Sequence, residues 1–150
     1  MPRYDPASTI ADARAAYFAR SGFADDGGYA DKWVKLQIGR RFFIAFPNTA
    51  ARVRSVRLHD IHHVLTEYDT TWAGEAEIGA WEVASGCADH YPAWVLNFGA
   101  IAIGLLIAPR KTIRAFRRGW RKPNLYRREF DESLLTRTVG DLRAELEIER

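Results

Sequence analysis

The fold is decided by residues 47–86, which read PNTAARVRSVRLHDIHHVLTEYDTTWAGEAEIGAWEVASG. Pro47 closes the preceding run, and Asn48 or Thr49 can cap a long helix that reaches to about residue 67. Polar residues then break the helical pattern, and Thr71 can cap a second helix to about residue 88. The stretch therefore predicts two consecutive helices joined by a short turn.

A cluster of metal-binding residue types lies on these two helices. His59 and His63 are four residues apart, so on a helix they stand one turn apart on one face, where two imidazoles can bind one ion. Asp60 flanks that face, and a helical hairpin would return Glu75 beside the histidines. We predict a divalent-metal site formed by His59, Asp60, His63 and Glu75. The alternative is a partly exposed helix surface with a solvated glutamate.

The second helix carries further candidate site residues. Glu75, Gly79, Glu82 and Gly86 follow the four, three, four spacing of one helix face. Because glycine costs roughly 1 kcal/mol relative to alanine inside a helix, two aligned glycines indicate either close helix packing or a cavity. We predict a cavity, with Gly79 and Gly86 in contact with substrate and Glu82 as the catalytic side chain. The alternatives for Glu82 are a residue that supports the ligands and a solvated charge.

His62, on the first helix, points away from the metal face and is predicted to be structural or to support the ligands.

These residues carry a family resemblance. The pattern His-Asp-x-x-His, then eleven residues and Glu, here His59, Asp60, His63 and Glu75, resembles the signature of the coenzyme Q (ubiquinone) biosynthesis protein four family. Residues 47–49, 62–66 and 74–78 are also similar to bacterial members, and a weaker similarity covers residues 142–146. The similarity is strongest over residues 47–86, and the chain is shorter than typical members.

The resemblance implies an α-helical fold, a bound divalent metal, a hydrophobic cavity for a polyprenyl chain and peripheral contact with the inner membrane. It also implies loss of the C1 carboxylate coupled to C1 hydroxylation of a polyprenylated aromatic acid. The ligand set itself suits zinc, iron, manganese or cobalt, and an oxidative reaction favours a redox-active metal. One alternative is a non-catalytic scaffold that binds polyprenyl lipid and carries a structural metal. Another alternative is a member of this family that acts on a different hydrophobic substrate.

The remaining segments predict an all-α, single-domain helical bundle over residues 1–150. Ser8 can cap a helix that ends before Gly22, and Thr138 can cap the last helix. Residues 29–46 are ambiguous: the first part looks helical, while 41–46 suits either a strand or a buried helix. We favour a helix throughout this segment.

An apolar segment and a basic segment follow the second helix. Residues 93–108 contain no charge but are interrupted by Asn97, and these sixteen residues are short of the roughly 20 that span a membrane. They suit a buried core helix, a wall of the prenyl cavity or a shallow membrane insertion. Nine of the nineteen residues from 110 to 128 are Lys or Arg, around an apolar stripe of Ile113, Phe116 and Trp120. This pattern predicts an anionic membrane surface as partner, ahead of a solvated basic face, and no nucleic acid.

Composition limits the class of protein. The chain has 150 residues, 47% of them hydrophobic and 27% charged, as expected for one globular domain. Cys87 is the only cysteine, so an intrachain disulfide and multi-cysteine metal sites are excluded, and the first thirty residues do not resemble a leader. We expect a cytoplasmic protein that is peripheral to the inner membrane. A second copy of the chain and other quinone-biosynthesis proteins are the further partners considered.

Overall fold

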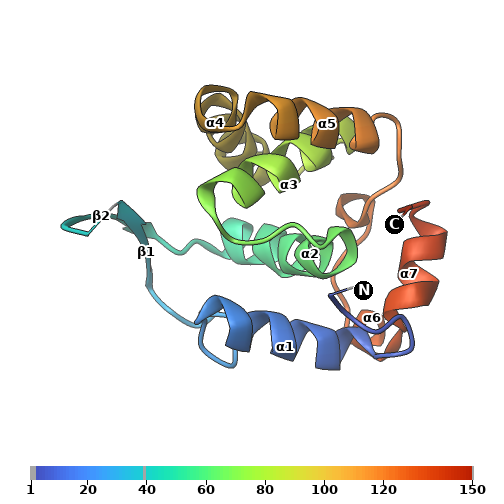
Figure 1. The fold of residues 1–150 in the computed structure, drawn as a ribbon. Helices are drawn as coiled ribbons and strands as arrows, with labels where there is room; N and C mark the ends of the chain where they lie inside the picture. Colours follow the sequence, from blue (N-terminus) through green and yellow to red (C-terminus); the bar gives the residue numbers. More distant parts are fainter. Residues whose placement is uncertain (1–2, 39, 150) are drawn as a thin grey trace.

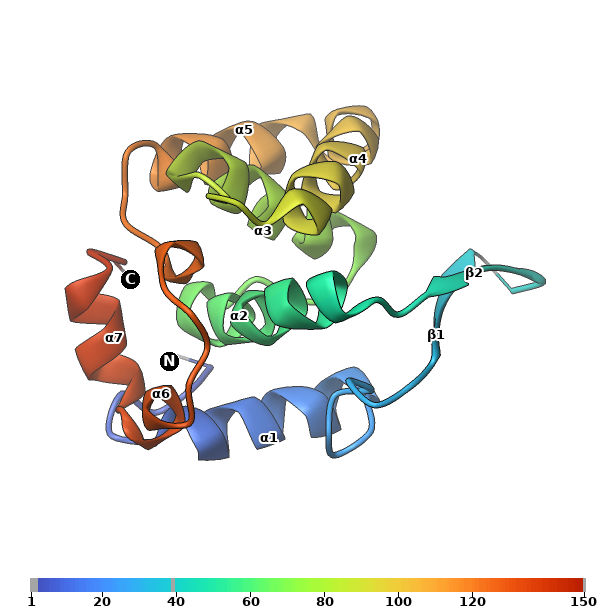
Figure 2. The same ribbon diagram turned by 180° about the vertical axis from the view of Figure 1, so that it is seen from behind.

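A computed structural model describes residues 3–38 and 40–149, and Figure 1 shows its helices stacked in layers. Helix α2 (Ala50–Thr66) lies in the middle. On one side of it lie α3 (Trp72–Ser85), α4 (Tyr91–Ile107) and α5 (Pro109–Gly119), and on the other side lies α1 (Ile10–Ser21). Figure 2 shows the same layers from behind, with the carboxyl-terminal elements at one end of α1 and α2. Because α2 lies in the middle, its residues can contact both outer layers.

The predicted helical pair is confirmed, with the expected caps. The Thr49 side chain accepts a hydrogen bond from the Arg52 N–H at the start of α2, and Thr71 accepts one from the Gly74 N–H at the start of α3. Both interactions satisfy an amide that has no partner within its helix. Gly22 ends α1 with φ of +72°, a conformation that glycine adopts without steric cost. The turn between the two capped helices α2 and α3 places the histidine face of α2 next to the start of α3.

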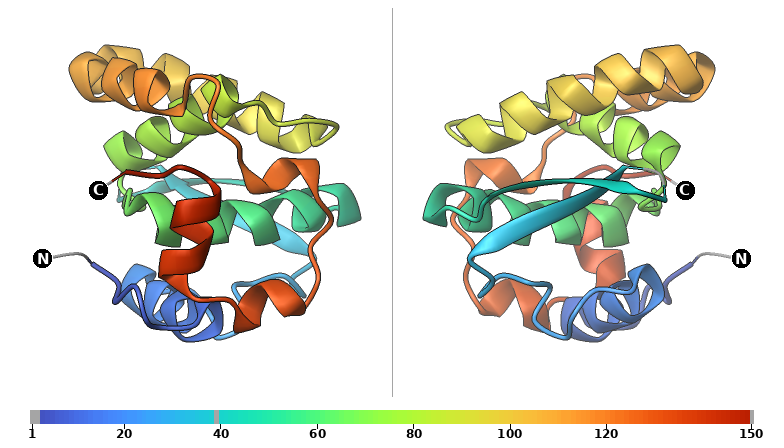
Figure 3. Two further views of the ribbon diagram at one scale, coloured as in Figure 1. Left: turned by 90° about the vertical axis from the view of Figure 1, so that its right-hand side faces the viewer. Right: turned by 90° about the vertical axis from the view of Figure 1, so that its left-hand side faces the viewer.

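The prediction of a helix over residues 29–46 is wrong, so the predicted all-α class is confirmed only as a mostly helical fold. The segment forms an antiparallel hairpin of β1 (Trp33–Ile38) and β2 (Phe42–Pro47), in which Trp33 pairs with Pro47 and Leu36 with Ile44. Aromatic and β-branched residues favour strands, and the adjacent partner strand satisfies the backbone hydrogen bonds. The fold is therefore mostly helical with one small sheet. Figure 3 shows this hairpin beside the stacked helices.

The main core lies between α1, α2 and the carboxyl-terminal elements. It includes Ile10, Leu58, Ile61, Leu65 and Leu142, all almost completely buried. The last part of the chain comprises η1 (Leu125–Arg127), α6 (Ser133–Thr136) and α7 (Val139–Glu145). The predicted cap of the last helix is confirmed, because Thr138 accepts a hydrogen bond from the Asp141 N–H. The starts of α1 and α7 lie side by side, because their capping residues Thr9 and Thr138 form an isolated antiparallel bridge.

Helix α4 is not a buried core helix, the first of the three expectations for this segment. Its buried residues are Ala93, Asn97 and Gly104, while many large apolar side chains on α4 face solvent: Tyr91, Val95, Leu96, Phe98, Ile103, Leu105, Leu106 and Ile107. In the parts of the chain that the structure describes, no helix has both the length and the apolar character needed to cross a bilayer.

Candidate metal centre

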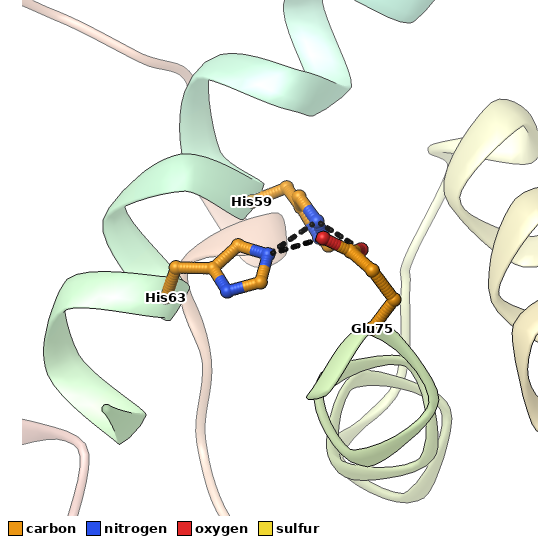
Figure 4. A group of neighbouring side chains, drawn as sticks. All are labelled: His59, His63 and Glu75. Carbon is orange, nitrogen blue, oxygen red and sulfur yellow. Dashed lines mark hydrogen bonds and ion pairs between the residues drawn. The ribbon is translucent and has the colours of Figure 1, made fainter. Parts of the chain in front are cut away.

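Three predicted ligands lie together between α2 and α3. His59 Nε2 and His63 Nε2 are 3.1 Å apart, and the Glu75 carboxylate lies 3.4 Å from His63 Nε2 and 3.7 Å from His59 Nε2. Figure 4 shows the two imidazoles on α2 and the carboxylate on α3 converging on one point. Among the described residues, these three form the group whose ligand atoms all lie within 4.8 Å of one another.

The second nitrogen of each imidazole is held by an acceptor that has no proton to donate. His63 Nδ1 is 3.0 Å from the carbonyl oxygen of Tyr68, in the turn after α2. His59 Nδ1 is 2.9 Å from Oε1 of Glu82. Because a carbonyl or a carboxylate can only accept, each Nδ1 carries the proton and donates it. In the neutral form of each ring, Nε2 then carries the lone pair at the point where the two rings meet, which is the form that a metal ligand requires.

The charges around the cluster favour a cation at this point. Two nitrogen lone pairs that face each other at 3.1 Å repel unless a proton or a metal cation lies between them. Burial alone would lower the pKa of His59, but the carboxylates of Glu82 and Glu75 raise it well above its usual value. Burial would raise the pKa of Glu75, yet the neighbouring His63 and His59 bring it well below its usual range. Glu75 is therefore a negatively charged carboxylate that can bind a cation.

The donor set fits a divalent metal in its spacing. Zinc–nitrogen and zinc–oxygen bonds of about 2.0–2.2 Å in a tetrahedron separate neighbouring ligand atoms by about 3.3–3.5 Å. The two Nε2 atoms are 3.1 Å apart, and Glu75 approaches His63 through Oε1 at 3.4 Å and His59 through Oε2 at 3.7 Å. With one ligand atom taken from each residue, the three atoms lie within 4.8 Å of one another. Nitrogen and oxygen ligands of this kind suit zinc, iron, manganese and cobalt alike. The three residues could therefore hold one metal ion between them.

One side of the cluster reaches solvent. The Glu75 side chain is 35% exposed and that of His59 18%, whereas the His63 side chain is fully buried. Two histidines and one carboxylate leave at least one coordination position open, as in catalytic zinc sites and in iron oxygenases. A small molecule or the reacting end of a longer one can approach from the Glu75 side.

Asp60 lies next to the cluster but is engaged elsewhere. Its Oδ2 accepts a hydrogen bond of 2.6 Å from the Tyr29 hydroxyl, and its Oδ1 lies 3.4 Å from the Tyr17 hydroxyl. Burial, the largest influence on Asp60, raises its pKa. The Tyr17 ring also stacks on His63, with the ring centroids 5.2 Å apart. Direct binding by Asp60 would require it to leave Tyr29, so a role as a ligand stays a prediction.

Glu82 lies behind the ligands and not on their open side. It is completely buried, and both its oxygens are occupied: Oε1 by His59 and His62, Oε2 by the Asn97 amide and the Tyr126 hydroxyl. Burial would raise its pKa, but the charge and hydrogen bonds of the two histidines lower it well below its usual range. Its contacts make Glu82 a positioning residue for His59, in contrast to the predicted catalytic role.

His62 is held away from the cluster. Its Nδ1 lies 2.7 Å from Glu82, and its Nε2 accepts a hydrogen bond of 3.0 Å from the Leu125 N–H. An amide N–H can only donate, so Nε2 has no proton and the ring is neutral, in agreement with a pKa that burial lowers. This geometry matches the structural role predicted for His62.

The two glycines do not share a hollow face. A side chain at Gly79 would meet the backbone of Asn97 at 3.3 Å and Cβ of Ala100 at 3.4 Å, so close packing of α3 on α4 explains this glycine without a cavity. Gly86 follows the end of α3 with φ of +93°, outside the helix, and its Cβ direction is open. Helix α3 thus ends before Gly86, so Gly79 and Gly86 do not lie on one helix face, as their predicted contact with substrate required.

Sequence reasoning missed the groups that orient the ligands: the Tyr68 carbonyl, Asn97, Tyr126, Tyr17 and Tyr29. Asn97 could have been recognised from the sequence, because it is a polar residue within an otherwise apolar segment. The others could not, because a backbone carbonyl and tyrosines scattered along the chain have no characteristic spacing.

A second surface feature lies on the outer layer. The exposed apolar residues of α4 are followed by exposed Ile113 and Trp120 and by exposed basic residues on and after α5: Arg110, Lys111, Arg114, Arg117 and Arg121. We call these exposed apolar and basic residues the α4–α5 surface. It combines a broad apolar area with a margin of positive charge.

Comparisons with protein-family models, with curated proteins and with solved structures give no significant match to this chain. The fold and site thus define a mostly helical protein with a cluster of two histidines and one glutamate, and the family resemblance stays a prediction.

Proposed function

We propose that the protein binds one divalent metal through His59, His63 and Glu75 and acts on a substrate at the open side. The observation that carries this proposal is the pair of Nε2 atoms facing Glu75, with each Nδ1 donating to a fixed acceptor. A structural metal is usually closed by four protein ligands, whereas three ligands with an accessible side are typical of catalytic sites.

The proposed reaction is the one that the family resemblance implies, the C1 oxidative decarboxylation and hydroxylation of a polyprenylated aromatic acid in ubiquinone biosynthesis. A bound divalent cation would supply a Lewis acid there, and a redox-active one would also permit oxidation. The protein's own contribution is positional. Glu82 and the Tyr68 carbonyl orient the imidazoles, Tyr17 covers one face of His63, and Glu75 lies at the accessible edge.

The proposal includes peripheral contact with an anionic membrane, through the α4–α5 surface. Soluble domains seldom expose so many large apolar side chains on one helix, since contact with water is unfavourable for them. Leu106 is 85% exposed and Val95 68%, and the basic residues nearby can contact anionic head groups. A polyprenylated substrate would be drawn from that surface.

Metal content tests the site directly. Elemental analysis of the purified protein should find about one divalent metal per chain. His63→Ala and Glu75→Ala should lose most of it, because no neighbouring residue can replace either ligand in the same geometry. His62→Ala is the matched control and should retain the metal, although it lowers stability. Equal metal loss in His62→Ala and His63→Ala, or no loss in either ligand variant, would contradict the proposed ligand set.

A cobalt-substituted protein separates the catalytic proposal from a non-catalytic scaffold with a structural metal. Azide should change the visible absorption of bound cobalt if a coordination position is open, and should leave it unchanged if the protein closes the site. Mass spectrometry of lipid extracted from the purified protein tests the substrate class. A polyprenylated aromatic acid or quinone supports the proposed pathway, and a different hydrophobic ligand alone would contradict it.

A further inference from the structure

A cleft of about 550 Å³ lies on a different side of α2 from the metal centre. Its walls are the segment 29–32, the first half of α2 and residues 129–130. Arg57, in the cleft, precedes His59 by two residues, which rotates the side chain by about 200° around the helix. The cleft is therefore separate from the open side of the metal centre.

Arg57 is held in this cleft by two aromatic rings. Its guanidinium carbon lies 5.4 Å from the centre of the Tyr29 ring and 5.3 Å from that of Phe130, and both rings line the cleft. Stacking of this kind occupies the faces of the planar guanidinium. It leaves the N–H donors in the plane of the group without partners, and these are the atoms that recognise a planar oxyanion.

Arg57 forms no ion pair with an acidic residue in the part of the chain that the structure describes. Within the described residues it forms no ion pair or hydrogen bond, and its Nε is shielded from solvent without an acceptor. A shielded donor without a partner is unfavourable, so its presence in a folded protein calls for an explanation. The two terminal nitrogens are not shielded in this way, and Arg57 lines the cleft.

Arg54, one turn away on α2, shows the contrasting case. It lines the same cleft, but its guanidinium is paired with Asp89 at 3.1 Å and with Glu129 at 2.5 Å. Pairing with Arg54 also occupies Glu129, one of the two acids in the cleft lining, and the other, Asp31, forms no ion pair with Arg57. The chain thus provides acids for one arginine and leaves its neighbour unneutralised.

A second unpaired arginine adds to the positive charge. Arg14 of α1 lies 6.0 Å from the Phe130 ring and, within the described residues, forms no ion pair or hydrogen bond. Arg14 and Arg57 therefore approach the same ring, Phe130. Like charges at such positions repel, and a bound anion would relieve that repulsion.

We propose that this cleft binds an organic carboxylate with an apolar body. Two N–H groups of Arg57 donate to the carboxylate in the paired geometry that guanidinium and carboxylate share. Val53, Ala50 and Phe130, which line the cleft, contact the apolar body. The proposal rests on Arg57 and its surroundings and does not depend on the metal centre.

Calorimetric titration of the purified full chain tests the proposal, with benzoate, acetate and phosphate as probes at constant ionic strength. Benzoate should bind with saturation and more tightly than acetate or phosphate, because it alone combines the carboxylate with an apolar body. Arg57→Met should weaken benzoate binding by about tenfold or more, and Arg57→Lys should restore it only in part, because lysine has the charge without the paired donors.

Arg20→Met is the matched control, because Arg20 also stacks on a tyrosine, at 5.1 Å from the Tyr4 ring, but lies outside the cleft. It should leave benzoate binding unchanged. Circular dichroism should confirm that both Arg57→Met and Arg20→Met are folded, since each variant loses an aromatic contact. Absence of saturable benzoate binding, or equal binding by Arg57→Met, would overturn the proposal. Tighter binding of phosphate than benzoate would overturn the assignment of a carboxylate.

Discussion

At the scale of single residues, the candidate metal centre depends on which nitrogen of each histidine carries the proton. The Tyr68 carbonyl and the Glu82 carboxylate settle this for His63 and His59, because neither can donate. Glu82 is itself held by His62, Asn97 and Tyr126, so its carboxylate cannot turn toward another partner. The position of His59 thus depends on a buried network that extends from α2 to α4 and η1.

Removing the charge of Glu82 should weaken metal binding without removing a ligand. In Glu82→Gln, His59 loses its charged acceptor, and the new amide group faces side chains that already donate. We expect a 10–100-fold loss of metal affinity, as is typical for residues that orient ligands. Competition with a chromogenic chelator measures the affinity, and circular dichroism confirms folding. Glu77→Gln, on the same helix, should bind metal like the parent chain; an equal effect of both variants would contradict the role of Glu82.

At the scale of elements, α3 and α4 pack closely where α3 has a glycine. The Cβ of a larger residue at Gly79 would lie 3.3 Å from the α4 backbone, which cannot move aside as a flexible side chain can. The contact leaves no space for a substrate ring at this position. It also joins the helix that supplies Glu75 to the helix that supplies Asn97.

Gly79→Leu should therefore destabilise the protein, which reverses the expectation from the sequence of a tolerant, cavity-lining position. Overpacking of a closed helix contact costs roughly 1–3 kcal/mol. Gly99→Ala on α4 is the control, because its Cβ would meet no atom within 4 Å and alanine favours the helix. Thermal unfolding compares the two variants. Unchanged stability of Gly79→Leu together with lost lipid binding would restore the cavity hypothesis.

The α4–α5 surface should bind vesicles that contain anionic lipid and release them as salt rises, because exposed charges are screened over about 10 Å at 0.1 M. Leu106→Asp places a charge at the most exposed apolar position and should abolish binding in a vesicle sedimentation assay. Phe43→Asp, at a residue of the β-hairpin that is 60% exposed, should bind normally. Equal binding of the parent chain to neutral vesicles would remove the basic residues as a cause.

At the scale of the whole molecule, the candidate metal centre lies between two layers. Its histidines belong to the middle helix α2 and its glutamate to α3 in the outer layer, as Figure 4 shows. The remaining contacts of α3 are concentrated on α4 and α5 within its own layer. A cation bound by both sides would therefore hold the outer layer against α2.

Metal removal should lower the stability of the entire protein. A ligand that binds only the folded state adds about 2.7 kcal/mol when its concentration is a hundred times its dissociation constant. We expect a chelator to reduce the thermal midpoint of the parent chain and added metal to restore it, in differential scanning calorimetry. His63→Ala should respond to neither. A midpoint of the parent chain that is insensitive to both reagents would show that the cation does not connect the layers.

The two helices that carry the candidate site, α2 and α3, were determined by the sequence alone. Thr49 and Thr71 cap their helices because a side-chain oxygen can satisfy an amide nearby in sequence, and the spacing of His59 and His63 follows from the helical turn. The turn after α2 is short, which made the approach of Glu75 predictable as well. All these features depend on residues that are close along the chain.

Only the tertiary structure decided which partners the site residues have. Asp60 has a favourable sequence position for a ligand, but Tyr17 and Tyr29 from distant segments engage its carboxylate. Glu82 shares the spacing of Glu75, yet the packing of α4 and η1 around it turns a predicted catalytic group into a support for His59. The pairing of residues 33–38 with residues 42–47 likewise depended on a partner strand and not on local periodicity. Such contacts join positions far apart in sequence, where neither helical spacing nor residue type specifies the neighbour.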